Sequence, residues 1–600
     1  MDSLVTIDSL YGDLLALKGA ILGRDILRPA ALRQIWRERL RPFWRLVPEL
    51  YEGIASRFAA QGENFLVIEV AAESRRFFGE QPSLLFLEAL AAARSGSPWR
   101  CREILVSRPD VLAQVADAPA LLARTFKDAW KATGDPRFLE QSFDYYHRAY
   151  LDSRGNVFPG VNAAAMALLG GKVETSRTLA GEVLGSLESP GAEDYWTAVT
   201  RAECLLILGE ISRSREHYRQ ACAGSEIPRA NLVTTRTQAR LLLPCHGCGA
   251  RDFDEVFPLP NIACFSGHRI DTPGRTPARF PASAVPAVAA RIGEILRGHR
   301  IEIGYCSASQ GGDLIFAEVV RGLPGGETRI FLPGGREDFR RTSVSVEGDS
   351  SWDARFDSAL VEADELTELE LAGSSGPGPE DFDYANRTCL GAAMMRAREL
   401  DCELKLIALW DGQAGPIGGT SDMVGLSLRA GVAVEVIDPI RPEAQPRAVT
   451  TAPDPAEEGR LFSIVGFRAE GGAIPAEPVR ARWLLWEDPY FTVIFRSAAD
   501  AAAFAAEIAG AHGSKAALHF GPVSLIVNPL TGEETPGGIH IKRTRELLAS
   551  CPDGRVCASA EFAAVARLEG FAGEFEYLGR LSPARGGPER QVFQLAPKPS

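Results

Sequence analysis

Four turns rich in glycine and serine in the middle of the chain contain the groups best suited to hold a phosphorylated ligand. Each turn follows a short apolar run. Its small residues let backbone N–H groups face an anion, which the N-terminus of a following helix also favours. The candidate ligand-binding residues, including arginines for counter-charge, are Ser266, Gly267, His268, Arg269, Arg275, Arg279, Ser309, Gln310, Gly311, Gly312, Asp313, Gly334, Gly335, Arg340, Trp410, Asp411, Gly418, Gly419 and Thr420. Together the turns predict a pocket for a nucleotide-like ligand, whereas any one alone could be a tight strand-to-helix connection.

Two residues of this set have a second interpretation. His268 could contact a phosphate or a base, or it could hydrogen-bond the local backbone. Trp410 could stack on a base, or it could belong to the core or the rim of the sheet. Nearby, Trp352 in SSWDARF is predicted to pack against the sheet.

A parallel sheet is needed to bring these turns together. Between residues 261 and 439, helix-like segments separate five apolar runs that each lead into a turn: IACFSG, IEIGYCSAS, TRIFLPGG, LKLIALWDG and VAVEVIDP. The helix-like segments are residues 286–297, 314–321, 385–400 and 421–429. This alternation indicates a doubly wound α/β sheet with its ligand site at the carboxyl ends of the strands. We assign residues 256–440 to this Rossmann-like domain.

The same turns resemble a known superfamily. The block FSGHRIDTPGR…RFP, followed by SASQGGDLIFAE, LPGG and ALWDG…GGTSDMV, is similar to the SLOG superfamily of Rossmann-like nucleotide-binding domains. That superfamily includes cytokinin-activating phosphoribohydrolases, a DNA-uptake protein and ligand sensors of bacterial immune systems. In the phosphoribohydrolases a PGGxGTxxE motif grips phosphate and places a catalytic glutamate at the glycosidic bond. Here GGTSD, residues 418–422, has its acid one residue earlier and one methylene shorter. The resemblance therefore implies that this chain binds phosphate, and it implies cleavage of a glycosidic bond less strongly.

An enzymatic alternative uses the same pocket. In an N-glycosidase that cleaves a nucleotide or an NAD-like molecule, Asp422 or Glu318 would be catalytic. Either carboxylate would stabilise the positive charge that develops on the ribose. Asp422 could instead cap the helix that follows it.

Residues 1–250 are predicted to be helical, because apolar residues recur at spacings of three and four. Helical hairpins at residues 121–150, 161–187 and 195–221 follow each other at close to the ~34-residue period of tetratricopeptide repeats, which stack into a solenoid. The stretches ARTFKDAW, SFDYYHRAY, FPGVNAAAMALLGG and DYWTAVTRAECLLILGE resemble the TRAFs-binding, tetratricopeptide-type domain of apoptosis signal-regulating kinases. The resemblance implies that this region docks a protein partner or self-assembles. A purely structural solenoid is the alternative.

Residues 461–600 are predicted to form an α+β, ferredoxin-like domain after a solvated linker, residues 441–460. LFSIVGF, ALHFGPVSLIVNPLTGEETPGGIHI, GRVCAS and EYLGR…QVFQL resemble the class III adenylate/guanylate cyclase homology domain. Such cyclases hold two metal ions with two aspartates.

The positions that carry cyclase chemistry are altered in this chain. The two metal-binding positions are Ser463 and Asp488, and the family's transition-state Asn and Arg fall on Lys542 and Glu546. These changes favour a degenerate cyclase domain that dimerises or binds partners. A cyclase completed by a partner subunit, with Mg²⁺ at Asp488, is the weaker alternative. No other metal site is predicted.

The composition limits the classes of function. Hydrophobic residues make up 46% of the 600 residues and charged residues 24%, which excludes disorder over most of the chain. The net charge of −13 disfavours binding to nucleic acid or anionic membranes, and no apolar run is long enough to cross a bilayer. Eleven dispersed cysteines and an N-terminus without a signal-peptide pattern predict a cytoplasmic protein with free thiols. Cys245 and Cys248 have the spacing of a redox pair or half a zinc site, but no second pair lies nearby, so we expect them to be inert.

These observations predict a cytoplasmic signalling protein that binds a nucleotide-derived ligand in its SLOG-like domain. The tetratricopeptide-like and pseudo-cyclase domains would dock a protein partner or assemble the chain into a homo-oligomer. No further cofactor is predicted. A role in stress or phage defence is suggested by the combinations in which such domains occur.

Overall fold

The computed structural model divides the chain into two compact units that meet in sequence between Leu259 and Pro260. The α/β domain and the C-terminal domain, which the sequence predicts as separate, lie together in the second unit, Pro260–Lys598. The structure describes residues 12, 29–39, 41–95, 97–153, 156–187, 194–224, 227–272, 274–346, 349–371, 373, 376–451, 460–469, 478–487, 489–512, 514–527, 532, 534–551, 554–581 and 590–596.

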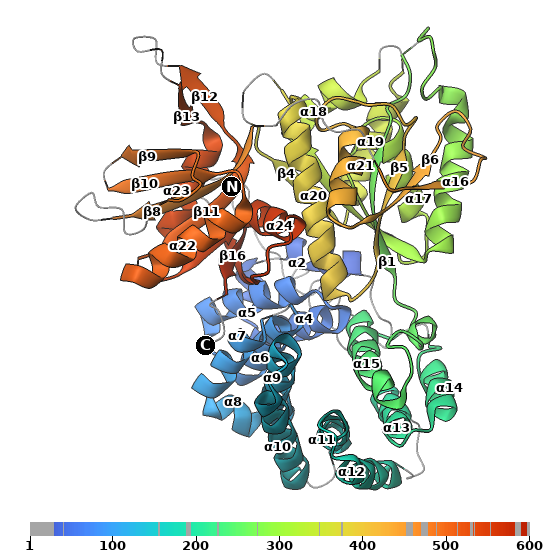
Figure 1. Cartoon of the computed structure of the whole chain (residues 1–600), viewed down its shortest axis with the longest axis vertical. Helices are drawn as coiled ribbons and strands as arrows, with labels where there is room; N and C mark the ends of the chain where they lie inside the picture. Colours follow the sequence, from blue (N-terminus) through green and yellow to red (C-terminus); the bar gives the residue numbers. More distant parts are fainter. Residues whose placement is uncertain are drawn as a thin grey trace. The chain divides into compact units, whose positions relative to one another are not determined.

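The described part of the first unit is helical (Figure 1). Proline begins several of its helices, including α4, α6 and α10, because the missing N–H would have no partner in the first turn. The elements are α2 (Pro29–Glu38), α3 (Arg41–Trp44), α4 (Pro48–Gln61), α5 (Asn64–Phe78), α6 (Pro82–Arg94), α7 (Pro98–Ser107), α8 (Pro109–Gln114), α9 (Ala118–Thr133), α10 (Pro136–Asp152), α11 (Val157–Leu169), α12 (Val173–Ser186), α13 (Tyr195–Ile207), α14 (Ile211–Ala221), α15 (Arg229–Leu242), η1 (Leu243–His246) and η2 (Asp254–Val256).

The predicted hairpins are α9–α10, α11–α12 and α13–α14, and the same contact recurs in each. A buried serine of the second helix donates a hydrogen bond to a backbone carbonyl of the first helix. The bonds join Ser142 to Ala123 (3.0 Å), Ser176 to Ala164 (2.8 Å) and Ser214 to Ala202 (2.7 Å). Alanine at the acceptor position lets the paired helices approach closely. This contact is the structural counterpart of the tetratricopeptide-like repeat.

The helix α15 closes the first unit on itself. It packs against α13 and α11 and also against α4, near the start of the unit (Figure 1). A Cβ atom added to Gly62, which follows α4, would lie 3.7 Å from Cβ of Ala230 on α15. α15 therefore joins the last helical hairpin of the unit to a helix near its start.

The first sheet of the second unit contains seven strands in the order β4-β3-β2-β1-β5-β6-β7. Its strands are β1 (Asn261–Gly267), β2 (Ile301–Cys306), β3 (Glu327–Pro333), β4 (Glu365–Leu369), β5 (Leu404–Leu409), β6 (Ala433–Ile437) and β7 (Arg447–Val449). Neighbours are parallel except for β7, which pairs antiparallel with β6. The five predicted strands are β1, β2, β3, β5 and β6. The sequence analysis missed β4 and β7.

The start of the predicted linker belongs to this sheet. β7 lies in it, and Nε of Arg291 donates to the carbonyl of Pro442 at 2.8 Å. Residues 441–449 are mostly exposed, as predicted, but the chain adds the edge strand β7 before it leaves the domain. Residues 452–459 lie outside the described residues.

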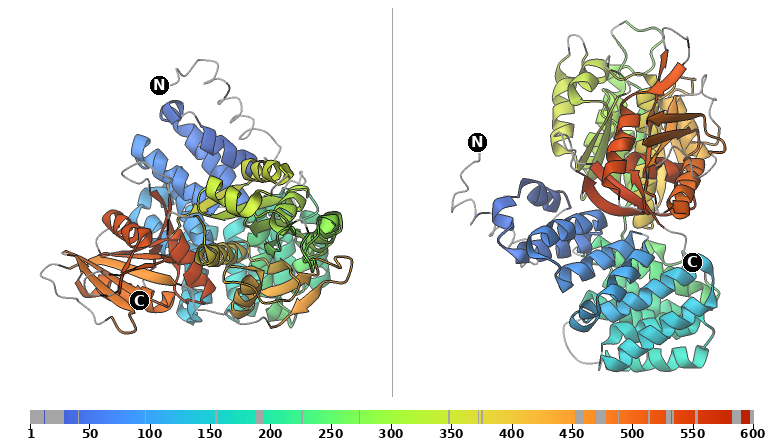
Figure 2. Two further views of the ribbon diagram at one scale, coloured as in Figure 1. Left: turned by 90° about the horizontal axis from the view of Figure 1, so that it is seen from above. Right: turned by 90° about the vertical axis from the view of Figure 1, so that its left-hand side faces the viewer.

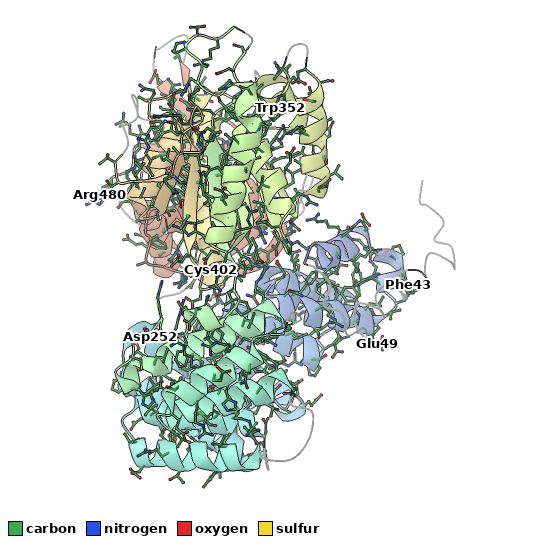
Figure 3. All side chains as sticks on the ribbon, turned by 90° about the vertical axis from the view of Figure 1, so that its right-hand side faces the viewer. Phe43, Glu49, Asp252, Trp352, Cys402 and Arg480 are labelled. Atoms are coloured by element: carbon green, nitrogen blue, oxygen red, sulfur yellow. The ribbon has the colours of Figure 1, made fainter. Side chains whose placement is uncertain are left out.

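Helices cover both faces of this sheet. One face carries α16 (Val285–Gly298), α17 (Gly312–Arg321) and α19 (Ser351–Glu362), and the other carries α20 (Pro379–Glu399) and α21 (Thr420–Arg429) (Figure 1). Short η3 (Ala282–Ala284), α18 (Arg336–Phe339) and η4 (Arg340–Val344) lie in the connections. Trp352 on α19, labelled in Figure 3, is 5% exposed and packs in the core with Leu332 of β3, as predicted.

The second sheet also has seven strands, in the order β15-β16-β14-β11-β8-β10-β9. Its strands are β8 (Leu461–Arg468), β9 (Trp483–Glu487), β10 (Tyr490–Phe495), β11 (Ala516–Pro522), β14 (Val556–Ser559), β15 (Phe575–Leu581) and β16 (Arg590–Leu595). β12 (Ser524–Val527) and β13 (Glu534–Gly537) form a separate two-stranded hairpin. The run β11-β8-β10-β9 is antiparallel throughout, as in ferredoxin-like sheets.

Helices lie on both faces of the second sheet, as Figure 2 shows from two directions. They are α22 (Ala498–His512), α23 (Ile539–Ser550) and α24 (Ala560–Leu568). Phe467 of β8 meets Phe504 of α22, whereas its neighbour Gly466 faces Thr544 of α23. Because successive strand residues point to opposite faces, α22 and α23 lie on opposite sides.

The helix α20 joins the two sheets of the second unit. It packs along α24, and a Cβ atom added to Gly391 would lie 2.2 Å from the carbonyl oxygen of Ala564. The two backbones therefore touch where the helices cross. Beside them, Glu370 is paired with Arg543 of α23 and lies 2.8 Å from Arg590 of β16.

Candidate ligand site

The carboxyl ends of β1 and β5 lie side by side, because these strands pair in parallel. From β1 the chain builds the sheet to one side, through β2, and later to the other side, through β5, so this edge is the switch point where open α/β sheets bind ligands. Oγ of Ser266, on β1, lies 3.4 Å from Oγ1 of Thr420, the first residue of α21. A Cβ atom on Gly267 would lie 3.1 Å from Cα of Gly312. The structure thus brings three of the four predicted turns together.

Asp313 holds the turn after β2 in place. Its side chain is buried, accepts a hydrogen bond from the backbone N–H of Gly267 at 3.2 Å and accepts another from Ser307. Burial raises the pKa of Asp313 to about 6, although these hydrogen bonds oppose the shift. Backbone carbonyls occupy the N-terminus of α17, because the N–H of Gly312 donates to His268 at 3.1 Å and that of Leu314 donates to Ser309 at 3.3 Å.

Gln310 and Gly311 lock the same turn against β1. Oε1 of Gln310 accepts a hydrogen bond from the N–H of Ile270 at 3.0 Å. Gly311 has φ of 92°, and a Cβ atom there would lie 2.7 Å from the carbonyl oxygen of His268. Only glycine fits this position without displacing the backbone. These two residues position the turn.

A charged network closes the ends of β1 and β5. Nε of Arg279 donates to Asp411 at 2.7 Å, and Nε2 of His268 accepts from the backbone N–H of Asp411 at 3.1 Å. Burial raises the pKa of Asp411, but Arg279, the backbone N–H of Gln413 and His268 together outweigh burial and hold the value at about 2. Burial, followed by the charge of Arg279, lowers the pKa of His268. Arg275 lies 3.5 Å from Asp271 on the adjoining turn.

The start of α21 is the helix terminus that is open to an anion. Its N-cap is Gly419, which has no side chain, and no side chain among the described residues caps it. Asp422 accepts a hydrogen bond from the N–H of Gly418 at 3.0 Å, and Asn386 of α20 donates to the carbonyl of Gly418 at 2.9 Å. The glycine turn is thus held from both sides. The first N–H groups of α21 carry the positive end of the helix dipole, which favours an anion.

Sequence reasoning missed Asn386 as a clamp and also missed a second carboxylate, Asp383, beside Asp422. Burial raises the pKa of Asp383 to about 6, Arg387 opposes the rise, and the charge of Asp422 adds to it. The sequence PEDF at residues 379–382 could have revealed them, because proline followed by acids is typical of a helix start. α20 begins at this sequence and not at residue 385, as the sequence analysis had it.

Glu318 and Arg340 each form an ion pair with a residue of α19. Arg355 donates to Glu318 at 2.6 Å, and Arg340 donates to Asp357 at 3.0 Å. Glu318 lies six residues into α17, about 9 Å along the helix from its start. α17 and α21 also cover opposite faces of the sheet, so Glu318 is not brought to the glycine turn.

Other predicted residues also lie apart from this edge or face inward. Trp410 is 3% exposed, and its indole N–H donates to the carbonyl of Gln413 at 2.8 Å, so it belongs to the core. Arg269 is exposed and donates to a carbonyl of η4. Gly334 and Gly335 follow β3, which lies two strands and about 10 Å from β1.

The cyclase-like positions do not form a metal site in the described residues. Ser463 is fully buried, its Oγ has no hydrogen-bond partner, and it pairs in register with Phe495 of β10. The first residue of β10, Tyr490, pairs with Arg468 instead, about 16 Å along the strand. Asp488 itself lies outside the described residues.

The two positions that correspond to the transition-state residues of cyclases contact each other. Nζ of Lys542 lies 4.0 Å from Glu546 on the exposed side of α23. The described residues contain no group of three or more His, Cys, Asp or Glu side chains that could hold a metal ion. All eleven cysteines are free thiols, and Cys245 is exposed. Among the helices that the structure describes, none has the length and apolar character needed to cross a membrane.

Comparison with known proteins supports the assignment of the helical region. Residues 66–167, from α5 to α11, match the family model described as Tetratricopeptide Repeats-Sensor (TPR-S). The first unit is therefore a helical region with tetratricopeptide-like repeats, and the matched family differs from the TRAFs-binding domain that the sequence resembles. No curated protein matches the chain.

The solved structures that the chain resembles include nucleotide cyclases. They are the adenylyl cyclase CyaB from P. aeruginosa (10% identity, TM-score 0.20, covering 23% of this chain and 95% of that chain), an adenylate cyclase from Trypanosoma brucei (11%, 0.20, 24% and 90%) and the guanylate cyclase domain of RhGC from Catenaria anguillulae in complex with GTP (11%, 0.19, 23% and 96%).

Proposed function

We propose that this chain is a cytoplasmic signalling protein that binds a nucleotide-derived, phosphorylated ligand at the carboxyl ends of β1 and β5, in a SLOG-like domain. The observation that carries the proposal is the 3.4 Å approach of Ser266 to Thr420 at the switch point of the sheet. It brings the uncapped start of α21 against the end of β1. A phosphate between them would accept backbone N–H bonds from α21 and hydroxyl bonds from both residues.

Arg279 adds charge to this site. Its Nε and one Nη bind Asp411 and His268, while its Nη1 has no hydrogen-bond partner among the described residues. The guanidinium is therefore fixed in orientation and keeps donors for an anion, which reduces the entropy lost on binding. In this proposal Asp313, like the side chains of the β2 turn, positions the turn and does not contact the ligand.

The contacts of Asp422 support a positioning role in preference to catalysis. Asp422 is 6% exposed and already accepts a hydrogen bond from Gly418. A glycosidase would need this carboxylate to face the ribose. The N-glycosidase and the partner-dependent cyclase therefore stay as alternatives that no contact of the described residues favours.

The helix α20 supports a relay of ligand binding to the C-terminal domain. Asn386 near its N-terminus clamps the glycine turn, and Gly391 further along touches Ala564 of α24. We propose that the degenerate cyclase domain and the tetratricopeptide-like unit dock a protein partner or a second copy of the chain. The eleven free thiols support a reducing, cytoplasmic location.

Replacing Thr420 by aspartate tests the proposed site. We expect the new carboxylate to repel a phosphorylated ligand and weaken its binding by at least about tenfold. The same substitution should not unfold the domain, because an acidic residue in the first turn stabilises a helix. Binding would be measured by isothermal titration calorimetry with AMP, NAD and ADP-ribose.

A matched control is Ser351→Asp, which adds the same charge to the exposed start of α19. It should bind like the unmodified chain, and Thr420→Ser should retain binding through its hydroxyl. Equal affinity of Thr420→Asp and Ser351→Asp for every ligand would refute the proposed site.

A further inference from the structure

Four basic side chains of α6 and α9 lie close enough for their charges to act on one another. We call Arg94 of α6 and Arg124, Lys127 and Lys131 of α9 the inner basic cluster. Arg94 and Lys127 are enclosed by the surrounding helices, yet both keep partial solvent exposure. They therefore line a part of the interior that water can reach.

Lys127 has no carboxylate partner. Its Nζ donates to Oε1 of Gln238 on α15 at 3.1 Å, and Nε2 of Gln238 donates to Glu203 of α13 at 2.8 Å. The amide of Gln238 thus separates the lysine from the nearest acid across the unit. Among the described residues no carboxylate oxygen lies within 4.0 Å of Nζ of Lys127, and two of its three N–H donors are left for other partners.

Arg94 is also without a carboxylate partner in the described residues. One of its Nη groups donates to the backbone carbonyl of Ala59 at 2.8 Å, while its Nε is buried and has no hydrogen-bond partner. Arg124 shares a single acid, Asp128, with Lys131, at 3.4 and 3.9 Å respectively. The four cations thus directly contact one carboxylate.

The pKa values agree with an excess of positive charge. Burial lowers the pKa of Arg94 to about 9 and that of Lys127 to about 8, and the charge of Arg124 lowers both further. Asp128 and Glu203 partly offset the shift of Lys127. Burial raises the pKa of Glu203 to about 7, and the hydrogen bond from Gln238 and the charge of Lys127 oppose this rise. Enclosed cations normally have an anion beside them, because burying an unpaired charge is costly.

We propose that the first unit binds a small oxyanion, a phosphate or a carboxylate group, at the inner basic cluster through the open donors of Lys127. The site is separate from the one at β1 and β5, since it lies in the other unit. Arg124, whose charge acts on both Lys127 and Arg94, supplies further positive charge, and Gln238 keeps Lys127 from collapsing onto Glu203. The oxyanion belongs either to a phosphorylated small molecule or to a small carboxylic acid.

The test uses the full chain with Thr420→Asp, so that phosphate binding at α21 does not contribute. Inorganic phosphate and succinate are titrated separately by calorimetry. We expect one of them to bind, and Lys127→Gln to weaken that binding by about tenfold or more, because a charge-assisted hydrogen bond is lost. Binding of phosphate would identify the phosphorylated class and binding of succinate the carboxylic class.

The control is Lys172→Gln, which removes a half-exposed lysine paired with Glu140 on the hairpin surface and should leave binding unchanged. Arg94→Gln is a second variant that should weaken binding independently. In anion-free buffer Lys127→Gln should melt no lower than the parent chain, because it removes an unpaired enclosed charge. The proposal is overturned if neither anion binds, or if binding is equally strong in the parent, Lys127→Gln and Arg94→Gln proteins. A failure of Thr420→Asp to affect nucleotide binding would instead refute only the site at α21.

Discussion

Replacing Gly391 by alanine is expected to lower the free energy of unfolding of the second unit by about 2 kcal/mol or more. The added Cβ would lie 2.2 Å from the carbonyl oxygen and 2.5 Å from the carbonyl carbon of Ala564. Both atoms are backbone of α24, so no side-chain rotation relieves the clash. The helices must separate along a crossing that joins the two sheets of this unit. Urea denaturation of the full chain would measure the change.

Gly510 provides a matched control for this substitution. It lies in α22 of the same unit, and a Cβ atom added to it would meet nothing within 4 Å. Gly510→Ala should therefore stabilise the unit by about 0.5–1 kcal/mol, since alanine is the better helix former. The two substitutions differ only in their surroundings. If both changed stability in the same direction, the close contact of α20 with α24 would not exist in solution.

Acidification below pH 6.5 is expected to destabilise the second unit through two buried histidines. Nε2 of His519 on β11 lies 2.9 Å from Nδ1 of His540 on α23, and Nδ1 of His519 lies 2.8 Å from Oγ of Ser559. Burial lowers the pKa of each histidine from 6.5 to about 3, and Arg590 adds to the shift of His519. The folded unit therefore holds both rings neutral.

The sign of the pH effect follows from these values. Between pH 6.5 and pH 3 the unfolded chain binds protons that the folded chain does not, so stability is complete above pH 6.5 and falls as the pH drops. Each ring contributes a loss of about 1.4 kcal/mol per pH unit, or about 5 kcal/mol for both between pH 6.5 and pH 4.5. Below pH 6 the raised pKa values of Asp313 and Asp383 act in the opposite sense and offset part of this loss. The contribution of the histidines is therefore the difference between the parent chain and a histidine variant in urea denaturation across this range.

Two variants separate this pair from other titrating groups. His540→Gln keeps a hydrogen-bond partner for His519 but removes one ring, so between pH 6.5 and pH 4.5 its stability should fall by about 1.4 kcal/mol per pH unit less than that of the parent chain. His299→Gln removes a half-exposed histidine that pairs with Glu435 in the same unit, and the pH dependence of its stability should match that of the parent chain. A slope unchanged by His540→Gln would contradict a buried neutral pair.

The turns of the candidate site could be predicted from sequence because each is local. A buried strand that ends in small residues and leads into a helix is visible in a single stretch of chain, as at Ser266, Gly311 and Gly418. What these residues contact was not predictable. Arg279 and Asp411 are 132 residues apart, and only the sheet order brings them together.

The missed elements have weak local patterns. β4 reads ELTEL, in which two glutamates replace the apolar residues of a buried strand, because it is the partly exposed edge of its sheet. β7 has three residues and lies in a proline-rich stretch. Of the two interpretations of Trp410, the structure agrees with the core residue, because its indole N–H donates to the carbonyl of Gln413 and its side chain is buried. Packing, and not propensity, decided each of these cases.

The central claim, a nucleotide-derived ligand bound without turnover at the ends of β1 and β5, is tested most directly by equilibrium dialysis read by mass spectrometry. The full chain and its Thr420→Asp variant would be dialysed against ATP, AMP, NAD, cyclic nucleotides and ADP-ribose. We expect at least one of these to be retained with unchanged mass by the full chain and lost from the variant. Retention of none, or release of a free base or nicotinamide that Asp422→Ala abolishes, would contradict the account, and the second result would make this chain an N-glycosidase.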